Sequence, residues 1–219
     1  MQSAVRASTW LSRISSPHRS IRLPLIISTL VSAFAPPVLA QSTFDAVIEI
    51  PTGTSVKYEF DFCANRIRVD RFVPMPVVYP VNYGFIPATL KTDGDPLDVV
   101  VYTREAIMSG AIVAFRPIGV LRMYDGGLAD EKIIGVPTSK VDASYDDVRT
   151  VDDLGLSHKQ RLENFFRVYK QVSDGTSPVE LRGFGDAAEA ERIVQAARRL
   201  ASERGAPEAR TPCPKERND

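Results

Sequence analysis

Three carboxylates fall within six residues in the stretch Lys91-Thr-Asp-Gly-Asp-Pro-Leu-Asp98, and an apolar run comes directly after it. Gly94 lets the backbone turn sharply because it has no Cβ, and Val99–Val101 predicts a buried strand behind the turn. Carboxylates this close repel one another unless a cation lies between them, and oxygen ligands at short spacing suit Mg²⁺ or Mn²⁺. We therefore interpret this acidic corner as a candidate metal site. Its carboxylates are Asp93, Asp95 and Asp98.

Three other interpretations of the acidic corner compete. A solvated acidic turn would have the same residue types. A calcium loop of the EF-hand type requires Gly at its sixth position and Glu at its twelfth, where this chain has Asp98 and Arg104. A phosphatase motif at the end of a hydrophobic strand does not fit either, because residues 87–92 make a poor strand. The choice between a metal site and a solvated turn depends on the rest of the chain.

Residues 1–40 differ in composition from the remainder of the chain. They hold four arginines and no acidic residue, and an apolar run extends from Leu23 to Ala40. Small residues before Gln41 match a signal-peptidase site, so we expect cleavage after Ala40 and an exported, periplasmic protein without a stable membrane anchor. The alternatives are an uncleaved anchor, an organelle-targeting peptide such as a mitochondrial one, and a cytoplasmic protein.

The charge balance restricts the possible partners. The chain has 27 basic and 27 acidic side chains, and loss of the four leader arginines leaves 23 against 27, about −4. This balance argues against nucleic acid as a partner, because the phosphate backbone selects a basic face. Only His158 remains after the leader, which argues against a Ser-His-Asp hydrolase and against a histidine-rich zinc site. Carboxylates, lysines and metals must therefore carry any chemistry.

The hydrophobic pattern predicts short strands and then helices. The expected strands are 46–50, 56–60, 66–71, 99–101, 111–123 and 133–136, and the expected helices are 157–170 and 186–204. Residues 72–90 predict an ordered, proline-stiffened loop, and Arg71 falls unexpectedly on the apolar face of its strand. We expect a signal peptide (1–40), one folded domain (41–204) and a disordered tail (205–219). Cys63 and Cys213 would form a disulfide in an oxidising compartment or remain two thiols.

Seven short motifs run in order along the expected domain. They are Ile48-Glu-Ile-Pro51, Lys57-Tyr-Glu59, Val69-Asp-Arg-Phe72, Tyr79-Pro-Val-Asn-Tyr-Gly84, Asp93-Gly-Asp-Pro-Leu-Asp98, Arg116-Pro-Ile-Gly-Val-Leu121 and Phe165-Phe-x-x-Tyr-Lys170. Together they resemble the soluble family I inorganic pyrophosphatases of bacteria. The resemblance implies an α+β, mainly β fold, with a five-stranded OB-type barrel and flanking helices.

The resemblance also implies hydrolysis of pyrophosphate to two phosphates with several Mg²⁺ ions per site, for which Mn²⁺ is a possible substitute. Asp95 is implied as the base that takes a proton from water. The implied metal-site carboxylates are Asp93, Asp98, Asp125 and Asp130, with Glu49 and Glu59 at the acidic mouth. The implied substrate-binding groups are Lys57, Arg71, Tyr83, Lys132, Tyr169 and Lys170, with Tyr79 behind them.

The sequence departs from the family pattern in several places. Gly126 stands where bacterial members usually have a second carboxylate, and the N-terminal arm is short. Asn164 and Val168 replace histidines found at subunit contacts, so we expect a homo-oligomer but leave a hexamer open. Two other functions compete: a catalytically silent exported barrel that binds divalent cations or phosphate, and a phosphatase for organic diphosphates.

Overall fold

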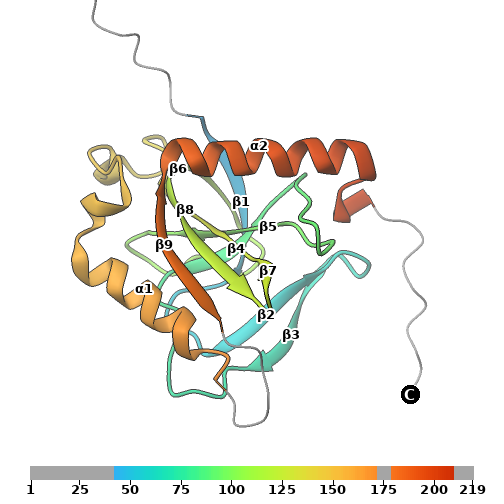
Figure 1. Cartoon of the computed structure of the whole chain (residues 1–219), viewed down its shortest axis with the longest axis horizontal. Helices are drawn as coiled ribbons and strands as arrows, with labels where there is room; N and C mark the ends of the chain where they lie inside the picture. The colour runs from blue at the N-terminus through green and yellow to red at the C-terminus, as the bar shows by residue number, and fades with distance from the viewer. Residues whose placement is uncertain (1–41, 172–178, 210–219) are drawn as a thin grey trace, which may run out of the picture. The chain divides into compact units, whose positions relative to one another are not determined.

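The computed structural model describes residues 42–171 and 179–209 (Figure 1). The strands are β1 Phe44–Ile50, β2 Val56–Asp61, β3 Arg66–Phe72, β4 Asn82–Ile86, β5 Leu97–Val101, β6 Ile112–Asp125, β7 Leu128–Ala129, β8 Lys132–Pro137 and β9 Glu180–Asp186. The α-helices are α1 Leu156–Val168 and α2 Ala187–Arg204, and the 3₁₀ helices are η1 Ala143–Tyr145, η2 Val151–Leu154 and η3 Pro207–Ala209.

Five of the strands close into a barrel. The sheet order runs β1-β4-β5-β8-β6, and β1 also pairs with β6, so the sheet returns to its first strand. β5 and β8 are parallel, whereas the other neighbours around the ring are antiparallel. β7 and β9 extend the sheet from β6, and β2 with β3 forms a separate two-stranded sheet. The predicted five-stranded barrel of an α+β protein is therefore confirmed.

The wall of this barrel separates two hydrophobic cores. Successive side chains of a strand point to opposite faces, and β5 shows the result: Val99 and Val101 pack in one core while Val100 packs in the other. The core of Val99 and Val101 includes Val194 of α2, and the core of Val100 includes Phe166 of α1. The rigid strand β5, held on both faces, begins directly at the acidic corner.

The helices and most strands lie where the hydrophobic pattern predicts them, and the differences have local causes. β4 lies within the segment predicted as a proline-rich loop, and β9 has no counterpart among the predicted strands because two glycines and several charges obscure its pattern. The predicted apolar face of 66–71 is wrong, because β3 pairs only with β2 and Val69 stays exposed. Order continues through η3, past the predicted boundary at residue 204, and Pro207 is buried.

Some predictions fall outside the described residues. These are the predictions for the leader (1–40) and for residues 210–219 of the expected tail. Cys213 lies in that tail, so the Cys63–Cys213 pair stays a prediction. Within the described ranges, neither helix is both long and apolar enough to span a membrane.

Candidate active site

The acidic corner is a tight turn between β4 and β5. The backbone N–H of Lys91 donates to the carbonyl of Asp95 at 2.7 Å, and Gly94 takes φ +99°, where a side chain would be strained. The backbone N–H of Asp95 donates to Oδ1 of Asp93 at 2.9 Å. The turn therefore presents its carboxylates on a backbone that is itself fixed by hydrogen bonds.

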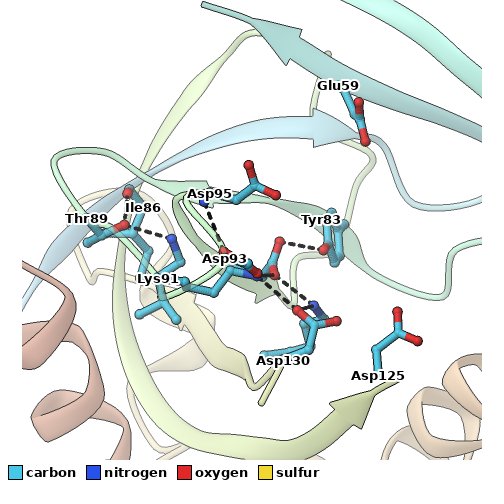
Figure 2. A network of polar contacts seen from close by, with 12 residues as sticks. Glu59, Tyr83, Ile86, Thr89, Lys91, Asp93, Asp95, Asp125 and Asp130 are labelled. Atoms are coloured by element: carbon cyan, nitrogen blue, oxygen red, sulfur yellow. Dashed lines mark hydrogen bonds and ion pairs between the residues drawn. The ribbon is translucent and has the colours of Figure 1, made fainter. Parts of the chain in front are cut away.

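Thr89 anchors the turn to the barrel. Its buried hydroxyl donates to the carbonyl of Ile86 at the end of β4 and accepts from the N–H of Leu97 at the start of β5, at 2.6 and 2.8 Å. Figure 2 shows this contact beside the acidic corner. One side chain thus joins the two strands from which the corner projects.

Two lysines and one tyrosine hold the carboxylates at the base of the site. Nζ of Lys132, only 2% exposed, lies 2.7 Å from both Asp98 Oδ2 and Asp130 Oδ1. Nζ of Lys91 lies 2.9 Å from the same two oxygens, and the hydroxyl of Tyr83 donates to Asp98 Oδ1 at 2.6 Å. Burial alone would raise the pKa of Asp98, but the two ammonium groups and these hydrogen bonds outweigh it and hold that pKa well below its ordinary value.

Asp95 differs from the other carboxylates of the site. Among the described residues it is the one carboxylate lining the cavity whose oxygens accept no hydrogen bond and form no ion pair. Partial burial and the negative charge of Asp93 raise the pKa of Asp95. Figure 2 shows its side chain apart from the dashed network of Lys91, Asp93, Tyr83 and Asp130. Asp95 is therefore the carboxylate of the cavity that can accept a proton without giving up a hydrogen bond or an ion pair.

Charged groups of both signs surround the mouth of the cavity, which has a volume of about 420 Å³. Lys57 on β2 pairs with Glu59 and lies 3.0 Å from Asp70 on β3. On another side of the mouth, Lys170 at the end of α1 pairs with Asp125 at the end of β6. The cavity thus offers cations and carboxylates to a small, highly charged ligand.

Glu49 has a different environment from these exposed pairs. Its Oε1 accepts from the backbone N–H of Phe60 at 2.7 Å, which ties β1 to β2. Burial raises the pKa of Glu49 to about 8, although this hydrogen bond opposes the shift. Glu49 therefore connects the hairpin to the barrel as well as lining the cavity.

The donor set at the base fits a hard divalent cation. Carboxylate oxygens of Asp93, Asp98 and Asp130 converge on the ammonium of Lys91, at 3.2, 2.9 and 2.9 Å from its Nζ. A cation is thus already accommodated among these oxygens, the ligand type that Mg²⁺ prefers. In this conformation, no group of three or more His, Cys, Asp or Glu side chains in residues 42–171 and 179–209 is arranged to coordinate a metal.

Comparison with known proteins identifies the family. The model of the inorganic pyrophosphatase family matches residues 46–202. The chain belongs to the inorganic pyrophosphatase family. The inorganic pyrophosphatase of Sulfolobus acidocaldarius is 40% identical over 158 residues, which span 72% of this chain and 91% of that protein. The inorganic pyrophosphatase of Rickettsia prowazekii is 43% identical over 152 residues, which span 69% of this chain and 88% of that protein. The solved structure of the Helicobacter pylori pyrophosphatase is 34% identical, with a TM-score of 0.70 over 75% of this chain and 99% of its own.

Thirteen of the fourteen residues predicted for a pyrophosphatase site line this one cavity. They are Glu49, Lys57, Glu59, Tyr79, Tyr83, Asp93, Asp95, Asp98, Asp125, Asp130, Lys132, Tyr169 and Lys170. Arg71 is the exception: it is half-exposed and donates to Asp70 at 2.5 Å, so its role in substrate binding stays a prediction. A bulge between Lys57 and Tyr58 shifts the pairing of β2 with β3 beside Arg71.

The hairpin between β6 and β7 shows how Gly126 replaces the expected carboxylate. Gly126 and Gly127 have φ of +57° and +81°, the combination that a tight two-residue hairpin turn requires. Asp125 precedes this turn and is held by Lys170. The hairpin of this pyrophosphatase-family chain is therefore short and presents a single carboxylate before the turn.

Three residues that contribute to the site were not predicted from the sequence. Lys91 lies inside the stretch that defines the corner, yet only the folded turn shows its side chain pointing back into it. Thr89 has no sequence signal beyond its place two residues before Lys91, and Asp70 requires knowledge of the β2–β3 register. All three act through contacts that a linear pattern does not contain.

Replacing Thr89 with valine is expected to lower the free energy of unfolding by about 1–3 kcal/mol, because the buried N–H of Leu97 then has no acceptor. Urea unfolding of the purified variant measures the loss. Thr92→Val is the matched control, since Thr92 is exposed in the same turn, and its effect is expected to stay within about 0.5 kcal/mol. Equal stabilities of the two variants would contradict the anchoring role.

Proposed function

We propose that this protein hydrolyses inorganic pyrophosphate to two orthophosphates, with Asp95 as the base and with Mg²⁺ as the cofactor. Family membership and the curated relatives, each named inorganic pyrophosphatase, support the reaction. One observation supports the role of Asp95 as the base. Among the described residues that line the cavity, its carboxylate has no partner, whereas the other carboxylates accept hydrogen bonds or form ion pairs. Asp93, Asp98, Asp125 and Asp130 are the proposed metal-site carboxylates, with Glu59 and Glu49 at the mouth.

The chemistry depends on the charges that line the cavity. Mg²⁺ supplies charge screening for the anion and lowers the pKa of water, from 15.7 to about 7 in favourable sites. Asp95 takes a proton from the attacking water. The oxygen of this water bonds to one phosphorus, and the bond from that phosphorus to the bridging oxygen breaks. Lys132 and Lys170 stabilise the charge that develops on the phosphate groups. Lys57 on β2 and the hydroxyls of Tyr83 and Tyr169 belong to the same proposed set of substrate contacts. Arg71 and Tyr79 complete this set.

The test is phosphate release from pyrophosphate by the purified protein with and without metal. We expect turnover in millimolar Mg²⁺, loss of turnover after EDTA treatment, and recovery when Mg²⁺ or Mn²⁺ is restored. A protein that binds pyrophosphate or Mg²⁺ without releasing phosphate would instead be the catalytically silent alternative.

Export and assembly stay proposals for this chain. We propose that residues 1–40 are removed and that the mature protein, a domain from residue 41 with a short tail, acts in the periplasm as a homo-oligomer. The arginine-bearing, acid-free start and the small residues before Gln41 support cleavage. Sedimentation velocity of the mature protein measures the assembly state.

Cleavage after Ala40 is expected to remove the single tryptophan of the chain, Trp10. Protein isolated from its native compartment should then begin at Gln41 and show only tyrosine-type fluorescence. Intact-mass spectrometry reads the start directly. Recovery of a species that retains Trp10 from that compartment would contradict removal of the leader.

A further inference from the structure

Lys91 occupies the centre of the acidic corner. Its ammonium meets oxygens of Asp93, Asp98 and Asp130, which come from the turn, from the start of β5 and from the residues just before β8. The side chain is 11% exposed, and Figure 2 shows it within the dashed network at the base of the site. The three contacts make Lys91 a cation enclosed by carboxylates, unlike a surface lysine.

Lys91 supplies a second positive charge to a cluster that already has one. Lys132 pairs with both Asp98 and Asp130 without it. Three carboxylates with two ammonium groups have a net charge of about −1, and the same group without Lys91 would have about −2. The attraction of the cluster for any further cation is therefore weaker while the Lys91 ammonium is present.

The backbone delivers this side chain to the cluster. The N–H of Lys91 donates to the Asp95 carbonyl at 2.7 Å, and the carbonyl of Lys91 accepts from the N–H of Gly94 at 3.2 Å. These bonds fix the Cα of Lys91 above the carboxylates, while its flexible four-carbon stem leaves the ammonium able to swing away. Lys132 has no such freedom, because it begins β8 and is almost fully buried.

A divalent metal held by the same three carboxylates would lie next to the Lys91 ammonium, and the two positive charges would repel each other. Mg²⁺ binds oxygen at about 2.0–2.1 Å and tolerates little distortion, whereas the Lys91 ammonium lies 2.9 Å from two of these oxygens. We propose that Lys91 is a built-in counter-cation that a divalent metal must displace from Asp93, Asp98 and Asp130. It lowers the affinity for the metal and stabilises the metal-free protein. This inference rests on the proposed function, since it concerns the metal that the reaction needs.

The direct test is calorimetric titration of the metal-free protein with Mg²⁺, and with Mn²⁺ as a second probe. Lys91→Met, which keeps the stem and removes the charge, is expected to tighten Mg²⁺ binding by about 5- to 150-fold, the usual range of coupling between two binding events. Lys91→Arg keeps the charge and should remain within about threefold of wild type. Lys140→Met, at an exposed lysine outside the cavity, is the matched control and should leave binding unchanged.

A second readout is independent of activity. The melting temperature of Lys91→Met should fall below that of wild type without metal and should match it at saturating Mg²⁺. If Lys91→Met does not fold, Lys91→Gln must give the same tightening. Suppose that wild type binds Mg²⁺ and releases phosphate, but that the uncharged variants at position 91 bind Mg²⁺ no more tightly than wild type. This result overturns the inference about Lys91 and leaves the proposed function standing. Wild type that binds no divalent cation overturns both this inference and the proposed function.

Discussion

Asp95→Asn is expected to lower turnover on pyrophosphate by about 10²–10⁴-fold at saturating Mg²⁺, the usual contribution of a positioned general base. Asparagine has the shape of aspartate but cannot accept the proton. In the described cavity the Asp95 carboxylate has no partner, so the substitution removes no hydrogen bond or ion pair that supports the turn. Steady-state turnover as a function of Mg²⁺ concentration measures the effect, and the Mg²⁺ dependence should change little.

Asp93→Asn is the control for this prediction, because Asp93 lies two residues away and is a proposed metal ligand that also contacts Lys91. It should instead raise the Mg²⁺ concentration needed for half-maximal activity. Under the interpretation of the corner as a solvated turn, both substitutions would change little. Near wild-type turnover of Asp95→Asn would show that another group takes the proton, and Asp125 would then be the first carboxylate to test.

Asp98→Asn is expected to lower the free energy of unfolding of the metal-free protein by about 3 kcal/mol and to raise the Mg²⁺ requirement. The change removes the negative charge that Lys132 and Lys91 share, and Lys132 is 2% exposed. Breaking a buried pair by removing one partner leaves an uncompensated charge, which typically costs about 3–5 kcal/mol; partial exposure of Asp98 favours the lower value. Urea unfolding at pH 7 measures the loss.

The stability that Asp98 contributes is expected to depend on pH. The folded pKa of Asp98 is depressed, because the two ammonium groups outweigh the effect of burial. Its stabilising contribution is therefore complete above its unfolded pKa, about 3.9, and is lost as the pH falls below that value toward the folded pKa. The stability difference between wild type and Asp98→Asn should shrink in acid.

Asp152→Asn is the matched control for Asp98→Asn, because Asp152 also pairs with a lysine but is 80% exposed. Its effect at pH 7 should stay below about 1 kcal/mol, as for other surface ion pairs. Equal effects of the two substitutions would contradict the claim that the buried pair is the one that matters.

The fold was predictable where burial imposes a clear period. Val99–Val101 lies in β5 between two cores, and Leu162, Phe165 and Phe166 make the buried face of α1 at helical spacing. β9 could not be predicted in the same way, because Gly183 and Gly185 interrupt its side-chain pattern and pairing with β6 fixes it instead. Elements held mainly by pairing with distant strands therefore escape a local pattern.

The site was predictable as a set of chemical groups rather than as a set of contacts. The spacing of Asp93, Asp95 and Asp98 indicated a shared cation, and the structure places all three on one cavity. The pairing of Lys91 with Asp130 joins positions 39 residues apart, and the pairing of Lys57 with Asp70 depends on the register of β2 against β3. Both depend on tertiary register, which the sequence of a single chain does not state.

Phosphate release from pyrophosphate, ATP and a phosphate monoester, measured side by side with the mature protein in buffered Mg²⁺, is the decisive test of the proposed reaction. The charged lining of the cavity, with Lys57, Lys132 and Lys170 among several carboxylates, predicts rapid release from pyrophosphate and far slower release from the two organic substrates. Asp95→Asn assayed in parallel should lose the pyrophosphate activity. Release from ATP or the monoester at a rate equal to that from pyrophosphate would show that the assigned substrate is wrong, and activity that survives in Asp95→Asn would show that the assigned base is wrong.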